Sequence, residues 1–341
     1  MEDNIIYSNI STKPAAANTA NYKRCATWDA WFWNPTLHSH GNPDLWTTVG
    51  TNGGPSAYGT FDQSGNVYEW NDLDSTVSHD INNNPTRGLR GGSYQDGVFD
   101  PLILSTEYHA HGSPAAAEVT SGLGWSVNGF RIASLLNPFS LSNFVFVDDA
   151  GNSADTGGSF IYDGIEQGRV AYNYYINKYC VTNTEYALFL NNVAITDSYD
   201  LYAAASARRS LSAWGVPFAY NGIDRSGASG SYSYSVKTNY GNKPVVFVNW
   251  FHCARYCNWL HNGQGAGSTE TGAYTLNGAV TGDAIVKNVG AKYHIPTENE
   301  WYKAAYYKGG GTNAGYWLYA TQSDSAPTCV TANSVGDGVI A

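Results

Sequence analysis

Charged side chains are scarce in this sequence, and long apolar runs are absent. Asp, Glu, Lys and Arg together make up 13% of the 341 residues, and the formal net charge is −10. Because phosphate contacts require clustered Lys and Arg, this composition argues against a nucleic-acid partner. A membrane span needs about 18 or more consecutive apolar residues, and no such run occurs, so we expect no membrane span.

The beginning of the printed sequence also lacks the features of a signal peptide. Residues 1–4 read MEDN, without the basic and apolar segments that a signal peptide carries. Methionine occurs once, whereas glycine (37), tyrosine (26) and tryptophan (11) are abundant. This mixture is typical of a loop-rich, aromatic-packed secreted protein, so we expect an extracellular or cell-surface location. Export then follows another route, or the precursor begins before Met1.

The cysteines are odd in number: Cys25, Cys180, Cys253, Cys257 and Cys329. None of them forms a Cys-x-x-Cys pair, so no structural zinc site is predicted. Cys253 and Cys257 lie one turn apart in a predicted helix, where small buried thiols are the simplest interpretation.

Helix starts can be read directly from the sequence. Thr182 with Glu185 and Thr297 with Glu300 form capping boxes, in which each side chain bonds a free backbone amide of the first turn. A further helix is expected at residues 250–261, where it ends before an Asn-Gly pair.

Short strands are expected at residues 87–94 and 127–134, where glycines mark bends. The GGG run of residues 309–311 is expected to end the last helix. A few helices among many short strands and long loops predict an α+β fold.

Several short blocks read like parts of one known domain in the wrong order. The first group is AYGTFD at residues 57–62, GNVYEW at 65–70, RGLRGGSY at 87–94 and GFRIAS at 129–134. The second group is INKYCVTNTEY at 176–186, KPV at 243–245 leading to Trp250, and PTENEWY at 296–302. The first group resembles the end of a domain, and the second group resembles its beginning.

Together these blocks resemble the formylglycine-generating enzyme family, or sulfatase-modifying factor family, in which the second group precedes the first. The resemblance implies a loop-rich, C-type-lectin-like α+β fold, circularly permuted or completed by a neighbouring subunit. We expect a front part at residues 1–134 (the family's C-terminal half), a joint at 135–143, and a back part at 144–341 (its N-terminal half).

The permuted order allows more than one arrangement. In a circular permutant, both parts of one chain fold together, which is tolerated where the old ends are close and the new ends are exposed. Alternatively, the front part of one molecule completes the back part of the next, and such head-to-tail exchange generates filaments. The joint spans at most about 30 Å, which permits both. The chain can also be a piece of a longer tandem array.

Two cysteines flank the proposed cut in the family domain. If the cut ends come together, Cys25 and Cys329 are expected to form a disulfide across it. This pairing follows from the permuted order and not from the cysteine spacing.

The resemblance also indicates which chemistry is missing. Family members that make formylglycine bind copper with two cysteines shortly after the Gly-Gly-Ser-Tyr strand. Asp96 stands at the first of these positions, and residues 97–102 contain no cysteine. Because copper(I) requires soft thiolate ligands, we expect no copper and no formylglycine-generating activity.

Calcium is the one metal that the resemblance implies for this chain. Calcium takes about six to eight hard oxygen ligands, which loops supply as carbonyls and carboxylates. Carried over by position, the ligands are the Gly65 and Val67 carbonyls with the Glu69 carboxylate at a first site, and the Asn21 side chain, the Tyr22 and Trp46 carbonyls and Asp44 at a second. The alternative for Glu69 is an ion pair or bonds to backbone amides.

These observations predict a non-catalytic extracellular structural or assembly protein that self-associates, as a head-to-tail filament where the parts are exchanged. The alternative is a C-type-lectin-like ligand- or carbohydrate-binding module. In that case the rings of Trp28, Trp31, Phe32 and Trp33 stack on a glycan or peptide. Those rings have a simpler role as well, which is packing against the domain or a neighbouring subunit.

Overall fold

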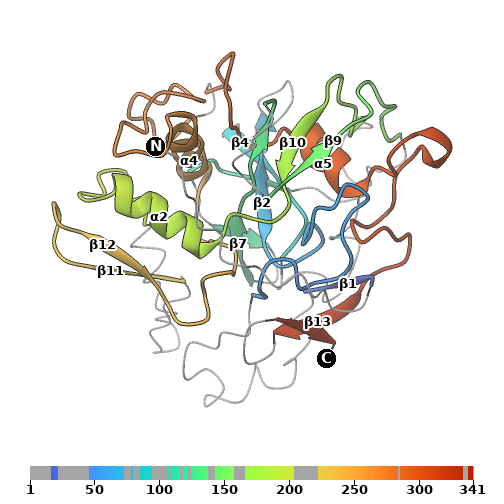
Figure 1. Cartoon of the computed structure of the whole chain (residues 1–341), viewed down its shortest axis with the longest axis horizontal. Helices are drawn as coiled ribbons and strands as arrows, with labels where there is room; N and C mark the ends of the chain where they lie inside the picture. The colour runs from blue at the N-terminus through green and yellow to red at the C-terminus, as the bar shows by residue number, and fades with distance from the viewer. Residues whose placement is uncertain are drawn as a thin grey trace.

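The computed structural model describes residues 17–21, 46–72, 78–79, 85–93, 104, 106, 110–115, 118–121, 124–136, 143–156, 166–202, 222–282, 285–332 and 337–340. Within these ranges, three α-helices are combined with short strands (Figure 1). None of these helices is long and apolar enough to cross a lipid bilayer. The described part therefore has the mixed helix and strand content that the sequence predicts.

The largest sheet is formed by the front part. Its strands are β2 (Tyr68–Asn71), β3 (Ser78–His79), β4 (Pro85–Arg90), β5 (Ala110–Gly112), β6 (Glu118–Ser121) and β7 (Gly124–Gly129). They lie in the order β3-β4-β2-β7-β6, with β5 paired to β4. β2 is antiparallel to β4 and parallel to β7. The GNVYEW block therefore lies in the middle of the sheet, where all four residues of β2 are buried.

A second sheet connects the two parts of the chain. It contains β8 (Ala133–Ser134), β9 (Phe144–Val147) and β10 (Tyr174–Asn177), in the order β8-β10-β9. Ile176 of β10 pairs with Ala133 on one side and with Val145 on the other. The strands before and after the joint therefore flank one common partner.

The strand predicted at residues 127–134 is interrupted, because β7 and β8 are separate strands. Between them the backbone bonds to the back part. The Val181 amide donates to the Phe130 carbonyl at 2.8 Å, and the Asn177 amide donates to the Ile132 carbonyl at 2.8 Å. This segment therefore docks on the back part and does not continue the front sheet.

A third sheet brings the two ends of the described chain together. It consists of β1 (Thr19–Ala20), β13 (Thr328–Ala332) and β14 (Gly338–Ile340). β1 is parallel to β13, with Ala20 opposite Cys329. Figure 1 shows β1 and β13 side by side in the lower part of the view.

The helices are α2 (Asn183–Val193), α4 (Trp250–His261) and α5 (Glu298–Tyr306). Both predicted capping boxes are confirmed, Thr182 with Glu185 at the start of α2 and Thr297 with Glu300 at the start of α5. α4 occupies the predicted residues and is capped by the Asn249 side chain.

α5 ends earlier than the GGG run predicts. Tyr307 follows the helix in an extended conformation and pairs with Tyr316. The helix therefore ends before the glycines, because Tyr307 forms a β-bridge in place of a further helical turn.

A separate hairpin is formed by β11 (Ile223–Ser226) and β12 (Ser233–Val236).

The interior is shared between the front and back parts. The largest apolar cluster combines Trp70 and Phe130 of the front part with Phe189 of α2 and Tyr256 of α4. The rings of Phe130 and Tyr256 meet edge to face, with centroids 5.3 Å apart, a favoured geometry for aromatic pairs. In Figure 1, α2 and α4 lie to one side of β2 and α5 lies to the other. The largest apolar cluster among the described residues therefore includes side chains from both sides of the joint.

Candidate functional site

The centre of the domain is a buried ion pair between Glu69 on β2 and Arg131, which lies between β7 and β8. Both side chains have an exposed fraction of 0%. Arg131 Nε donates to Glu69 Oε2 at 2.5 Å, and Nη2 donates to Oε1 at 2.6 Å. Burial lowers the pKa of Arg131, but the charge and hydrogen bonds of Glu69 outweigh it and raise the pKa above its ordinary value. The pair is therefore a charged, bidentate contact, which is among the strongest kinds of hydrogen bonding in proteins.

The remaining donors of Arg131 reach backbone oxygens on both parts of the chain. Nη1 donates to the carbonyls of Asn177 at 3.1 Å and Lys178 at 3.4 Å, both at the end of β10. Nη2 donates to the Phe61 carbonyl at 2.9 Å. Arg131 therefore ties the front part to the back part.

Two side chains of the back part complete the hydrogen bonding of Glu69. Trp301 Nε1 donates to Glu69 Oε2 at 2.9 Å. The Cys180 thiol donates to Glu69 Oε1 at 3.3 Å. We call Glu69, Arg131, Cys180 and Trp301 the Arg131 cluster. All four come from sequence blocks that were recognised separately, and the fold brings them into contact.

Cys180 is a free, buried thiol within the Arg131 cluster. Burial and the nearby Glu69 carboxylate raise its pKa well above the ordinary value. The thiolate is the nucleophilic and metal-binding form of cysteine, so this sulfur stays protonated at neutral pH. The cluster therefore favours a structural role for Cys180.

Asp62 is a second buried carboxylate beside the cluster, and the sequence analysis did not single it out. Its oxygens accept hydrogen bonds from the Gly50 amide at 2.6 Å and from Asn52 Nδ2 at 2.9 Å. Burial raises the pKa of Asp62 to about 6, although these bonds and Arg131 lower it. Asp62 and Glu69 together place two carboxylates near one guanidinium. The sequence signal that could have pointed to Asp62 is the Asp-x-x-Gly-Asn run at residues 62–66, directly before β2.

The first predicted calcium set is only partly suited to a cation. Both Glu69 oxygens already accept bonds from the cationic Arg131, which repels a second cation. The Gly65 carbonyl accepts a bond from the Val67 amide at 3.0 Å. The ion-pair alternative for Glu69 is therefore the arrangement present, and calcium at Gly65, Val67 and Glu69 stays a prediction that requires Arg131 to give up this carboxylate.

The second predicted calcium set is described in part. Asn21 and Trp46 lie within the described residues, whereas Tyr22 and Asp44 lie outside them. The Asn66 side chain links the two described stretches, because its Oδ1 accepts from Asn21 Nδ2 at 3.2 Å and from the Thr47 amide at 3.1 Å. The two predicted sets thus lie on neighbouring loops. Among the described residues, no group of three His, Cys, Asp or Glu side chains is placed to hold a metal ion.

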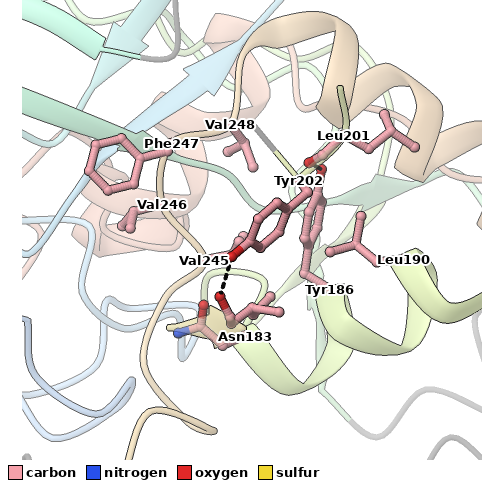
Figure 2. A pocket seen from close by; sticks show the side chains of 10 residues that line it. Asn183, Tyr186, Leu190, Leu201, Tyr202, Val245, Val246, Phe247 and Val248 are labelled. Atoms are coloured by element: carbon pink, nitrogen blue, oxygen red, sulfur yellow. Dashed lines mark hydrogen bonds between the residues drawn. The ribbon is translucent and has the colours of Figure 1, made fainter. Parts of the chain in front are cut away.

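A narrow cavity lies between α2 and the segment 245–248 (Figure 2). Its volume is about 10 Å³, which is room for about one water molecule. At its wall the Tyr202 hydroxyl donates to the Ile223 carbonyl at 3.1 Å. Because it has room for only about one water molecule, this cavity as described does not admit a sugar or a peptide.

Other predicted positions fall outside the described residues. These are Cys25, the aromatic side chains Trp28, Trp31, Phe32 and Trp33, and Asp96 at the position of the first copper-binding cysteine of the family. Cys329 is disulfide-bonded, as the predicted pairing with Cys25 requires. The other described cysteines, Cys180, Cys253 and Cys257, are free and buried.

Comparison with known families identifies the back part. The chain belongs to the family of the sulfatase-modifying factor enzyme 1-like domain, whose sequence model matches residues 150–335. This stretch contains the whole second group of blocks, which confirms the resemblance to the family. No curated protein and no solved structure gives a significant match.

Proposed function

We propose that this chain is a non-catalytic extracellular structural protein, built on a permuted family domain, that assembles by exchanging its front and back parts between copies. The observation that supports this proposal most directly is the Arg131 cluster. Its guanidinium comes from the front part and bonds Asn177 and Lys178 of the back part. A buried ion pair of the core thus contributes hydrogen bonds between the two parts.

Two further observations support parts of this proposal. The Glu69 oxygens and the neutral Cys180 thiol bond to each other and to neighbouring side chains, which favours a structural role over catalysis. Cys329 is disulfide-bonded, and disulfides persist mainly in oxidising compartments such as the cell exterior.

The exchange itself rests on the way the core is divided. Trp70 and Phe130 pack against Phe189 and Tyr256, so the surface between the parts has the character of a domain interior. An interface of this kind is typical of obligate complexes. The same contacts are available to a second copy, since only the joint decides which back part a front part meets.

Light scattering and negative-stain microscopy of the purified chain test the proposal. We expect species larger than a monomer whose size grows with protein concentration, and linear particles in the images. A monomer at every concentration would contradict assembly by exchange. A catalytic turnover by the unaltered chain would contradict the non-catalytic role.

A further inference from the structure

The sheet of β8, β10 and β9 has two outer edges, and they differ in their backbone partners. At the β8 edge, the Ala133 amide donates to the His294 carbonyl at 2.8 Å, and the His294 amide donates to the Ala133 carbonyl at 2.9 Å. At the other edge, β9 has no backbone partner beyond β10 among the described residues. We call this outer side of β9 the open edge.

The register of the sheet determines which backbone groups face the open edge. The Lys178 amide, directly after β10, donates to the Asn143 carbonyl, directly before β9, at 2.6 Å. Because alternate residues of an antiparallel strand bond to the same neighbour, Val145 also bonds to β10. The N–H and C=O groups of Phe144 and Phe146 therefore point away from β10 and into the open edge.

The side chains of this strand are apolar and partly exposed. Phe146 has an exposed fraction of 47%, and its ring lies against Tyr175 of β10 with centroids 4.9 Å apart. Phe144 and Val145 are half-buried. Aromatic and β-branched residues favour strand pairing, and an exposed apolar edge is a template for a strand of another chain.

A second copy of the same strand fits the open edge. When two copies of β9 pair antiparallel with a two-fold axis at Val145, Phe144 of each copy lies opposite Phe146 of the other. Each such pair exchanges both of its outward backbone hydrogen bonds. The phenyl rings then lie opposite each other across the two strands, which is a stabilising cross-strand contact. This register therefore uses all the outward groups of Phe144 and Phe146.

The charges next to β9 favour this antiparallel direction. Asp148 and Asp149 directly follow the strand and are exposed. In a parallel, in-register pair, each of these carboxylates lies beside its own counterpart, and like charges directly opposite are destabilising. In the antiparallel pair, the acidic residues of the two copies lie at opposite ends of the contact.

We propose that the open edge of β9 is a self-association site, at which two copies of the chain pair antiparallel about Val145 into one continuous sheet. β9 and β10 both belong to the back part, so this contact forms in the same way with exchanged and with unexchanged front parts. A two-fold contact closes at the dimer, whereas head-to-tail exchange continues to longer species. The inference therefore goes beyond the proposed assembly and does not depend on it.

Cysteine cross-linking of the full chain tests the register. In this pair the two Val145 Cα atoms lie about 4.5 Å apart, within the span of about 4.4 to 6.8 Å that a disulfide bridges. With oxidised glutathione, Val145→Cys is expected to form a covalent dimer about tenfold faster or more than Ser235→Cys, because pairing holds its thiols at high effective concentration. Ser235 is exposed on β12, and the unaltered chain shows any cross-linking by the native cysteines.

A second substitution tests the contact itself. Adding Phe146→Lys to Val145→Cys is expected to slow the cross-linking about tenfold, because a charge replaces the apolar ring at the edge. Phe146→Lys alone should also weaken self-association in sedimentation velocity. Ile195→Lys is the matched control, since Ile195 has an exposed fraction of 54% and directly follows the end of α2. α2 lies across β2 from α5 (Figure 1), and β9 packs on α5.

The outcomes separate this contact from the exchange of parts. Equal cross-linking of Val145→Cys and Ser235→Cys overturns the contact and leaves the proposed assembly standing. A cross-linking rate that Phe146→Lys does not change, while the melting temperature is kept, also overturns it. Fast cross-linking of Val145→Cys in a chain that never exceeds a dimer supports the contact and contradicts assembly by exchange.

Discussion

At the scale of single residues, Arg131 makes the most direct test of the buried ion pair. Its guanidinium is fully buried and donates to one carboxylate and three backbone carbonyls. Removing one partner of a buried pair leaves the other charge without compensation, which costs more than the pair itself contributes.

Arg131→Met is therefore expected to lower the free energy of unfolding by about 3 to 5 kcal/mol, because the buried Glu69 carboxylate loses its cationic partner. Urea unfolding followed by tryptophan fluorescence measures the change. Lys308→Met is the matched control, since Lys308 pairs with Asp324 at the surface at 3.9 Å and such pairs contribute at most about 1 kcal/mol. Equal losses in both variants would contradict the central role of Arg131.

Asp62 predicts a pH dependence of stability. Its pKa is raised to about 6 in the folded chain, so the folded state binds the proton more tightly than the unfolded state. The stability from this group is fully present below the unfolded pKa near 4, and it is lost as pH rises through 6. Among the charges near Asp62, Arg131 lowers this pKa and Glu69 raises it, and burial has the largest effect.

The comparison with Asp62→Asn isolates this effect. Between pH 4 and pH 7 the unaltered chain should lose about 2 to 3 kcal/mol of unfolding free energy relative to the variant. Urea unfolding at closely spaced pH values measures the difference. A difference that stays constant with pH would show that Asp62 ionises normally in the core, and a difference that grows in the opposite direction would show that its pKa is lowered there.

At the scale of elements, the start of α2 offers a local test. The Thr182 hydroxyl accepts from the Glu185 amide at 3.3 Å, and Glu185 Oε2 accepts from the Thr182 amide at 2.7 Å. Thr182→Ala is expected to cost about 1 kcal/mol of unfolding free energy, whereas Thr182→Ser keeps the hydroxyl and most of the stability. Thermal unfolding of both variants measures this, and equal melting temperatures would contradict a stabilising cap.

The helices were predictable because their signals are local. A capping box needs only residues four positions apart at most, and α4 spans the residues predicted for it. The GGG run gave the wrong end for α5, because Tyr307 bonds to Tyr316, which no local pattern encodes. The strand predicted at 127–134 failed for the same reason, since residues 130–132 bond to the back part.

The Arg131 cluster could be predicted only in part. The blocks that contain its members were recognised, and an ion pair was one alternative for Glu69. The partner itself lies 62 positions away along the chain, and Trp301 lies 232 positions away from Glu69. Sequence spacing carries no information on contacts at such separations, so both required the fold.

At the scale of the whole molecule, calcium can be tested against the ion pair. Because the Glu69 oxygens are held by Arg131 and Trp301, we expect the first predicted set to contribute little, so that a melting temperature lowered by EDTA reports on the second set. Differential scanning calorimetry with EDTA and with added calcium measures this. A calcium-dependent rise that Asp44→Asn removes would instead establish the second predicted set of ligands.

The order of the Arg131 contacts also constrains how the chain folds during its synthesis. Glu69 and Arg131 leave the ribosome before Asn177, which follows Arg131 by 46 residues. At about 5 to 20 residues per second, the carbonyl acceptors of the back part follow roughly 2 to 9 s later. During this interval the guanidinium of Arg131 has Glu69 and the Phe61 carbonyl as partners but lacks its acceptors on the back part.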